Sequence, residues 1–131
     1  MKFISPGKES ISPNHSRKIS ECLMEFALEI APADSARDTF ANAVGMAAML
    51  WNVPVLPEAE QARSMDVIRS WLAQIGRLDL QLEIGRLLEL RRKRYATDRR
   101  VIMNYKLEYG AKGPELIVAS VDLDRPENQG R

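Results

Sequence analysis

The sequence has one cysteine and one histidine among 131 residues, and this scarcity argues against several kinds of chemistry. Cys22 has no second cysteine with which to form an internal disulfide. His15 stands alone in a polar stretch, which makes a His-rich zinc site or a Ser-His-Asp arrangement in the core implausible. No glycine-rich phosphate loop follows a strand pattern. We therefore expect no enzyme activity, no metal, no cofactor and no small-molecule substrate.

Carboxylates are present, but their placement favours an ordinary surface over a catalytic site. Glu21, Glu25 and Glu29 recur every four residues after Arg17, which puts them on one side of a predicted helix. Such a row could hold a hard cation or transfer protons if a second row faced it. Without a facing row, it is typical of a solvated helix face.

The sequence also lacks a hydrophobic run long enough to cross a membrane. Residues 40–56 carry no charge, but Asn42, Asn52 and Pro54 interrupt them. The uninterrupted apolar part is well short of the ~20 residues that span a bilayer, so it predicts a buried helix. Residues 1–13 have no apolar core of the kind found in secretory signals. Together with the single cysteine, this predicts a cytoplasmic protein with no membrane contact.

Hydrophobic periodicity predicts a single α+β domain over residues 13–123, between a loosely ordered arm at residues 1–12 and a polar tail at 124–131. Apolar residues at helical spacing predict four helices, at about residues 13–31, 34–52, 57–75 and 79–95, with Gly76 ending the third. Alternating residues then predict two strands, 99–109 and 115–123, joined by a longer turn at 110–114. The predicted fold is a four-helix core followed by a C-terminal antiparallel β-hairpin.

We expect the second helix to be the most buried one. The predicted core side chains are Ile19, Leu23, Phe26, Phe40, Val44, Ala48, Trp51, Ile68, Leu72, Ile84 and Leu88. A second face of the same helix carries the small residues Ala41, Gly45 and Ala48, which predicts close approach by another helix. The alternative is that Gly45 lets a ligand reach the backbone.

Positive charge gathers in residues 86–100, which hold seven basic and two acidic side chains, although the whole chain has a net charge of only +1. Basic residues near a helix C-terminus are favoured by the helix dipole and need no further function. The alternative is a nucleic-acid surface that contacts phosphates. Its candidate residues are Arg91, Arg92, Lys93, Arg94, Arg99 and Arg100.

The hairpin carries apolar residues at both alternating sets of positions, and an isolated pair of strands leaves two edges unpaired. A hairpin packed on helices needs only one apolar face, so the second face predicts a partner, most simply another copy of the chain. The predicted interface residues are Ile102, Asn104, Lys106, Leu116 and Val118. We therefore expect a non-enzymatic interaction protein that forms a homodimer or docks on another protein, with nucleic-acid binding as the alternative.

Overall fold

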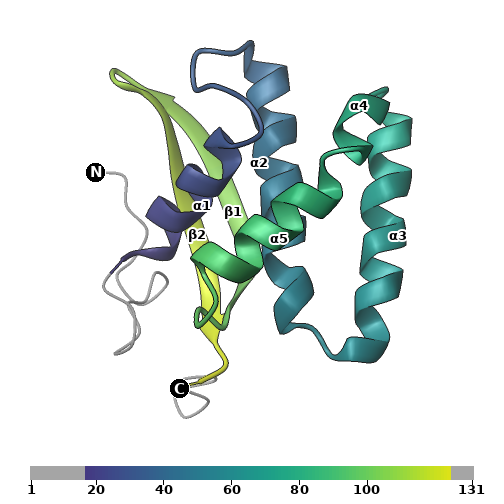
Figure 1. The fold of residues 1–131 in the computed structure, drawn as a ribbon. Helices are drawn as coiled ribbons and strands as arrows, with labels where there is room; N and C mark the ends of the chain where they lie inside the picture. Colours follow the sequence, from purple (N-terminus) through teal and green to yellow (C-terminus); the bar gives the residue numbers. More distant parts are fainter. Residues whose placement is uncertain (1–16, 125–131) are drawn as a thin grey trace.

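The structure, a computed structural model, describes residues 17–124 and confirms the α+β fold, with helices first and an antiparallel hairpin last (Figure 1). The elements are α1 (Ile19–Leu28), α2 (Arg37–Asn52), a short 3-10 helix η2 (Val53–Val55), α3 (Glu58–Gln74), α4 (Leu78–Gln81), α5 (Ile84–Arg94), β1 (Arg100–Gly110) and β2 (Gly113–Asp122). The predicted N-terminal arm, the start of the first predicted helix and nearly all of the predicted tail lie outside the described residues.

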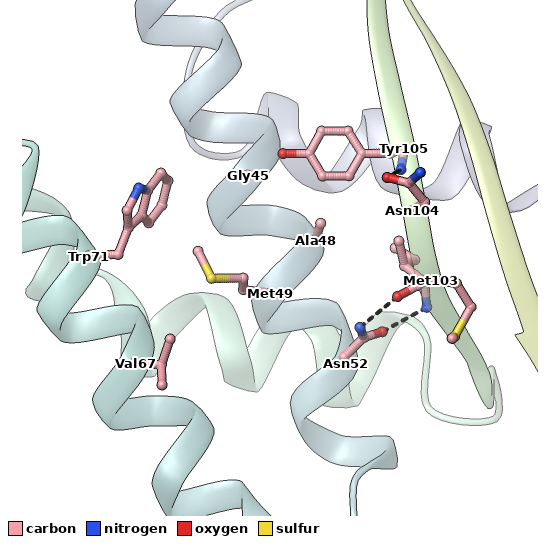
Figure 2. A pocket seen from close by; sticks show the side chains of 10 residues that line it. Gly45, Ala48, Met49, Asn52, Val67, Trp71, Met103, Asn104 and Tyr105 are labelled. Carbon is pink, nitrogen blue, oxygen red and sulfur yellow. Dashed lines mark hydrogen bonds between the residues drawn. The ribbon is translucent and has the colours of Figure 1, made fainter.

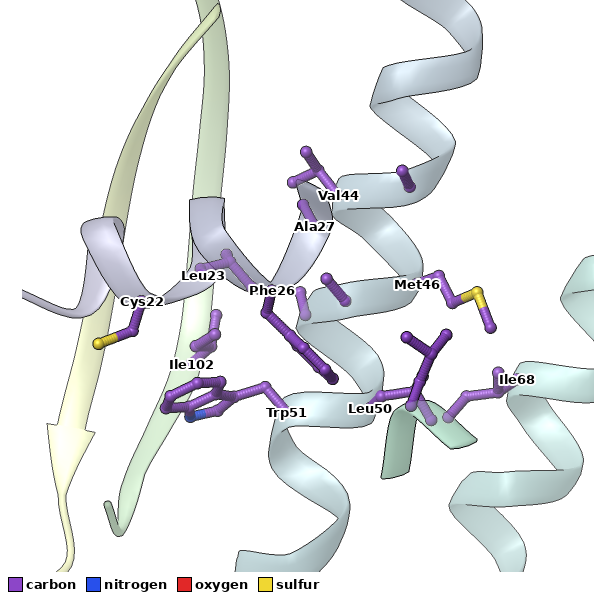
Figure 3. Packing of buried hydrophobic residues seen from close by; sticks show 14 of the residues in the cluster. Cys22, Leu23, Phe26, Ala27, Val44, Met46, Leu50, Trp51, Ile68 and Ile102 are labelled. Carbon is purple, nitrogen blue, oxygen red and sulfur yellow. The ribbon is translucent and has the colours of Figure 1, made fainter. Parts of the chain in front are cut away.

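Helix α2 lies at the centre, with the hairpin and α1 on one side and α3 on the other (Figure 1). It has nine buried residues, more than any other described helix. Phe26 of α1 and Tyr95, just after α5, pack around Trp51, with ring centroids 6.3 and 4.8 Å from the Trp51 ring. Figure 3 shows Phe26 and Trp51 side by side in this core. All of the predicted core side chains are buried.

The fourth predicted helix is two helices, because the chain turns at Leu82 and Glu83. Apolar spacing could not reveal the break, since Leu80 before it and Ile84 after it are both buried. Asp79, the first residue of the predicted helix, lies inside α4, and its two carboxylate oxygens accept hydrogen bonds from the Arg77 guanidinium. The turn redirects the chain so that α5 crosses towards α1 and the hairpin (Figure 1).

The hairpin turn is tighter than predicted. Gly110 pairs with Gly113, so only Ala111 and Lys112 lie between the paired residues. Gly113 has a φ of 111°, which residues with a side chain rarely adopt. The third helix does end as predicted at Gly76, whose φ is 75°.

A β-bulge in β1 breaks the alternation that the sequence predicted. Ile102 pairs with Ser120 and Asn104 pairs with Ala119, so Met103 has no partner residue on β2. Before the bulge, Arg100 and Ile102 point towards the helices; after it, Tyr105 shares a face with the buried Val118. The residues that point inward are therefore even-numbered before the bulge and odd-numbered after it. For this reason both alternating sets of β1 residues contain apolar side chains, although β1 has only one apolar face.

Candidate functional site

The apolar residues of the predicted interface belong to the chain's own core. Ile102, Leu116 and Val118 are buried against the helices, and only Asn104 and Lys106 are exposed. The prediction that all five form an exposed surface is therefore wrong. The bulge separates Ile102, which faces inward, from Asn104 and Lys106, which would share its face in a regular strand. On β2 the prediction took the wrong face as the outer one, since Leu116 and Val118 are buried while Ile117 and Ala119 are half-buried.

Arg91, a candidate for phosphate contact, is only 2 % exposed. Its guanidinium donates hydrogen bonds to the carbonyl oxygens of Trp51, Tyr95 and Asp98 and lies 3.9 Å from the centre of the Trp51 ring. Burial lowers the pKa of Arg91 to about 10, so the side chain stays charged near neutral pH. The prediction of an exposed Arg91 is wrong, because this residue joins α2 to the segment before β1.

Arg100 is also buried, with no exposed surface. Its guanidinium pairs with Asp98 at 2.6 Å and donates to the carbonyl oxygen of Arg17 and, at 3.8 Å, to the sulfur of Cys22. Burial raises the pKa of the Cys22 thiol, although the nearby Arg100 charge opposes the shift. Arg100 thus holds the start of β1 against α1, and its predicted role on an exposed basic surface is wrong.

Of the four other candidate basic residues, three pair with carboxylates within the chain. Arg94 contacts Glu29 at 3.3 Å, Lys93 contacts Glu89 at 3.3 Å, and Arg99 contacts Asp124 at 3.3 Å. The fourth, Arg92, is exposed. The pairing of Arg94 with Glu29 also shows that part of the glutamate row binds across to α5.

Glu25 is the most constrained member of the glutamate row. It accepts hydrogen bonds from the Tyr95 hydroxyl and from Arg17. The hydrogen bond from Tyr95, helped by Arg17, lowers the pKa of the Glu25 carboxyl, although partial burial opposes this. Because the folded pKa is the lower one, this stabilisation is present above the unfolded pKa and is lost as the pH falls through the folded pKa.

We expect Glu25→Gln to lower the melting temperature at neutral pH, with the difference from the unmodified chain disappearing as the pH falls through the acid range. Thermal unfolding followed by circular dichroism at a series of pH values measures this effect. Glu21→Gln is the matched control on the same helix, because Glu21 is more exposed and has only a long, 3.8 Å contact with Arg17. Equal pH dependence of the two variants would contradict the role of the Tyr95–Glu25 contact.

An uncharged groove of about 490 Å³ lies between α2, α3 and the bulged part of β1 (Figure 2). Gly45, Ala48, Met49 and Asn52 of α2 form its floor. Val67 and Trp71 of α3 form one wall, and residues 102–105 of β1 form the other. All ten lining residues are uncharged, in a chain in which 28 % of residues carry a charge. This volume and apolar lining are typical of binding sites.

Gly45 is required where two aromatic side chains meet over α2. A Cβ atom at this position would lie 3.2 Å from the Trp71 ring and 3.3 Å from the Tyr105 hydroxyl oxygen. Figure 2 shows these side chains reaching α2 from opposite sides. Gly45 and Ala48 thus form the floor of a groove, and the expected close contact with another helix at this face is replaced by Trp71 and Tyr105.

Side chains bind the main chain of β1 on the side away from β2. The Asn52 amide donates to the Ile102 carbonyl at 2.9 Å and accepts from the Ile102 N–H at 2.8 Å. The Trp51 indole N–H donates to the Arg100 carbonyl, and Asn104 accepts from the Tyr105 N–H. These bonds satisfy main-chain groups that an added strand would otherwise use.

Asn52→Ala should destabilise the chain by about 1–3 kcal/mol, because it leaves two main-chain groups of Ile102 without their partner. Urea unfolding measures the change. Asn52→Asp is the matched control, since it keeps the acceptor for the Ile102 N–H and loses only the donor. If Asn52→Ala lowered the free energy of unfolding less than Asn52→Asp does, the charge of the new carboxylate would be more harmful than the loss of both hydrogen bonds. The role given to the two Asn52 hydrogen bonds would then be contradicted.

Sequence reasoning missed Val67, Trp71, Met103 and Tyr105 as members of one site. The available signal was Gly45 inside a helix otherwise rich in core residues, since glycine there indicates close approach by another group. The partner residues could not be identified, because they lie on α3 and on β1 beyond the bulge.

Three further features concern the predictions about enzyme activity, metal binding and membrane contact. A smaller hollow of about 410 Å³ touches Glu21 and Glu25, but Arg17 contacts both carboxylates. Within residues 17–124, no cluster of His, Cys, Asp and Glu side chains has an arrangement suited to a metal ion. No helix in the same range is both long and apolar enough to cross a bilayer.

Comparison with known proteins found no matching family model, no similar curated protein and no similar solved structure. The groove is therefore interpreted from its own geometry and chemistry.

Proposed function

We propose that this chain is a non-enzymatic, cytoplasmic protein that works by binding another protein chain through the groove beside its C-terminal hairpin. The observation that carries the proposal is the clustering of exposed apolar surface. Of the six large hydrophobic side chains exposed in residues 17–124, Val67, Met103 and Tyr105 all line this one groove. Such clustering around an uncharged hollow is characteristic of interaction surfaces.

The proposal keeps the hairpin at the binding surface, but only two of the five predicted interface residues line the groove. The strand β1 contributes Ile102 and Asn104 together with Met103 and Tyr105, whereas Leu116 and Val118 are buried on β2 and Lys106 does not line the groove. The nucleic-acid alternative is less well supported, because Arg91 and Arg100 are buried and Lys93, Arg94 and Arg99 pair with carboxylates. Phosphate binding would require exposed cations free of such pairing.

A photo-reactive residue placed in the groove tests the proposal in cells. Val67 is replaced by p-benzoylphenylalanine, because its side chain is 55 % exposed and lines the groove. Irradiation should give an adduct of defined higher mass that contains this chain and a second polypeptide. The same residue placed at Lys112 in the hairpin turn is the control and should give no such adduct. If the probe at Val67 cross-links to nothing, or only to nucleic acid, the proposal fails.

A further inference from the structure

We infer that the occupant of the groove is a second copy of this chain, which docks so that Met103 of each copy enters the groove of the other. The inference rests on the proposed function and specifies its partner. It follows from the shape of the groove, from its lack of charge and from the hydrogen bonding of its β1 wall.

The groove surface has both parts that a two-fold contact requires. In such a contact the same patch meets itself, so it must carry a protrusion and a hollow that fit each other. Met103 is displaced by the bulge, has no partner residue on β2 and is 64 % exposed. The hollow lies beside it and is lined by Ala48 and Met49 of α2 and by Val67 and Trp71 of α3. The flexible methionine side chain adapts readily to a hollow of this kind.

Charge is also compatible with self-association. No charged side chain lines the groove, so two copies would not place like charges together at the centre of the contact. Each flank presents both signs: Arg63 and Asp66 lie on α3 in an adjoining hollow, and Lys106 pairs with Glu108 on β1. A two-fold axis can bring α3 of one copy towards β1 of the other. In that arrangement Arg63 can lie near Glu108 of the second copy, and Asp66 near its Lys106.

An extended peptide that adds a strand to β1 fits the structure less well. Strand addition draws its affinity from free main-chain groups at a sheet edge. Next to the groove, Asn52 already binds both main-chain groups of Ile102, and Asn104 binds the Tyr105 N–H. The occupant must therefore bind mainly through side chains, as a second copy with an inserted methionine would.

Light scattering of the full chain during size-exclusion chromatography, over a wide concentration range, tests the inference. We expect a dimer for the unmodified chain and at least about tenfold weaker association for Met103→Lys, because the new charge would enter an apolar hollow. Val67→Lys provides a second variant at an exposed position. Leu82→Lys is the matched control, since Leu82 is 85 % exposed and does not line the groove, and it should remain dimeric.

Cross-linking between different chains adds a geometric test. A Met103→Cys chain mixed with a differently tagged Val67→Cys chain should form a mixed disulfide on oxidation, whereas buried Cys22 should stay unreacted. A monomer at all concentrations, or a dimer that Met103→Lys does not weaken, overturns the inference. If the chain is monomeric while the probe at Val67 cross-links to a different protein, only the second-copy inference fails. If that probe also cross-links to nothing, the proposed function fails with it.

Discussion

Asp98→Ala is expected to destabilise the chain by about 3–5 kcal/mol, because it leaves the Arg100 guanidinium buried without its nearest carboxylate. Asp98 accepts from the Arg100 main-chain N–H and from two guanidinium nitrogens, at 3.2, 2.9 and 2.6 Å. The mutation therefore removes charge pairing and main-chain bonding together. Chemical denaturation with an unfolding free energy measured for each variant gives the size of the loss.

A double variant separates the charge from the lost packing. Asp98→Ala combined with Arg100→Leu removes the uncompensated charge, so its total loss should be smaller than the sum of the two single losses. A loss below about 1 kcal/mol for Asp98→Ala alone would contradict the buried pairing. Purely additive losses would show that the two side chains stabilise the chain independently.

Arg91→Met should cost at least about 3 kcal/mol, since three buried carbonyl oxygens lose their donor and the Trp51 ring loses the cation stacked on it. Methionine has a similar length, so the change tests the hydrogen bonds more than the volume. Unfolding in urea measures the effect. Arg91→Lys should be intermediate, because an ammonium keeps the charge but cannot reproduce the planar arrangement of donors.

Arg92→Met is the matched control, because the neighbouring Arg92 is exposed and should change stability by no more than about 0.5 kcal/mol. If Arg91→Met lowered the free energy of unfolding no more than Arg92→Met does, the structural role given to Arg91 between α2, α5 and β1 would be contradicted. The pair of variants therefore distinguishes a structural arginine from a surface arginine one residue away.

The helical part of the fold followed from the sequence because its signal is local. Phe40, Val44 and Trp51 recur at helical spacing, and their burial needs no knowledge of what packs against them. The role of Arg91 did not follow, because its acceptors on Trp51 and Asp98 are brought to it by tertiary packing. A run of basic residues has the same composition whether one member points inward or all point to solvent.

The groove was even less accessible to sequence reasoning. It depends on Trp71 of α3, on Tyr105 of β1 and on a one-residue irregularity at Met103. Period-two alternation assumes a regular strand, so the bulge misplaced every side chain on one side of it. The residue types at the site were visible in the sequence, but not their convergence.

The bulge also makes Met103 a residue that β1 could lose without a change in its pairing. Without Met103, the pairs Ile102–Ser120 and Asn104–Ala119 would become consecutive, so the strand would be regular and the residues on either side would keep their faces. A single-codon deletion here would thus remove a side chain that is 64 % exposed while Tyr105 stays opposite Val118 and Ile102 stays opposite Ser120. The extra residue adds a side chain to the outer surface of the strand, and the inward packing of the hairpin does not depend on it.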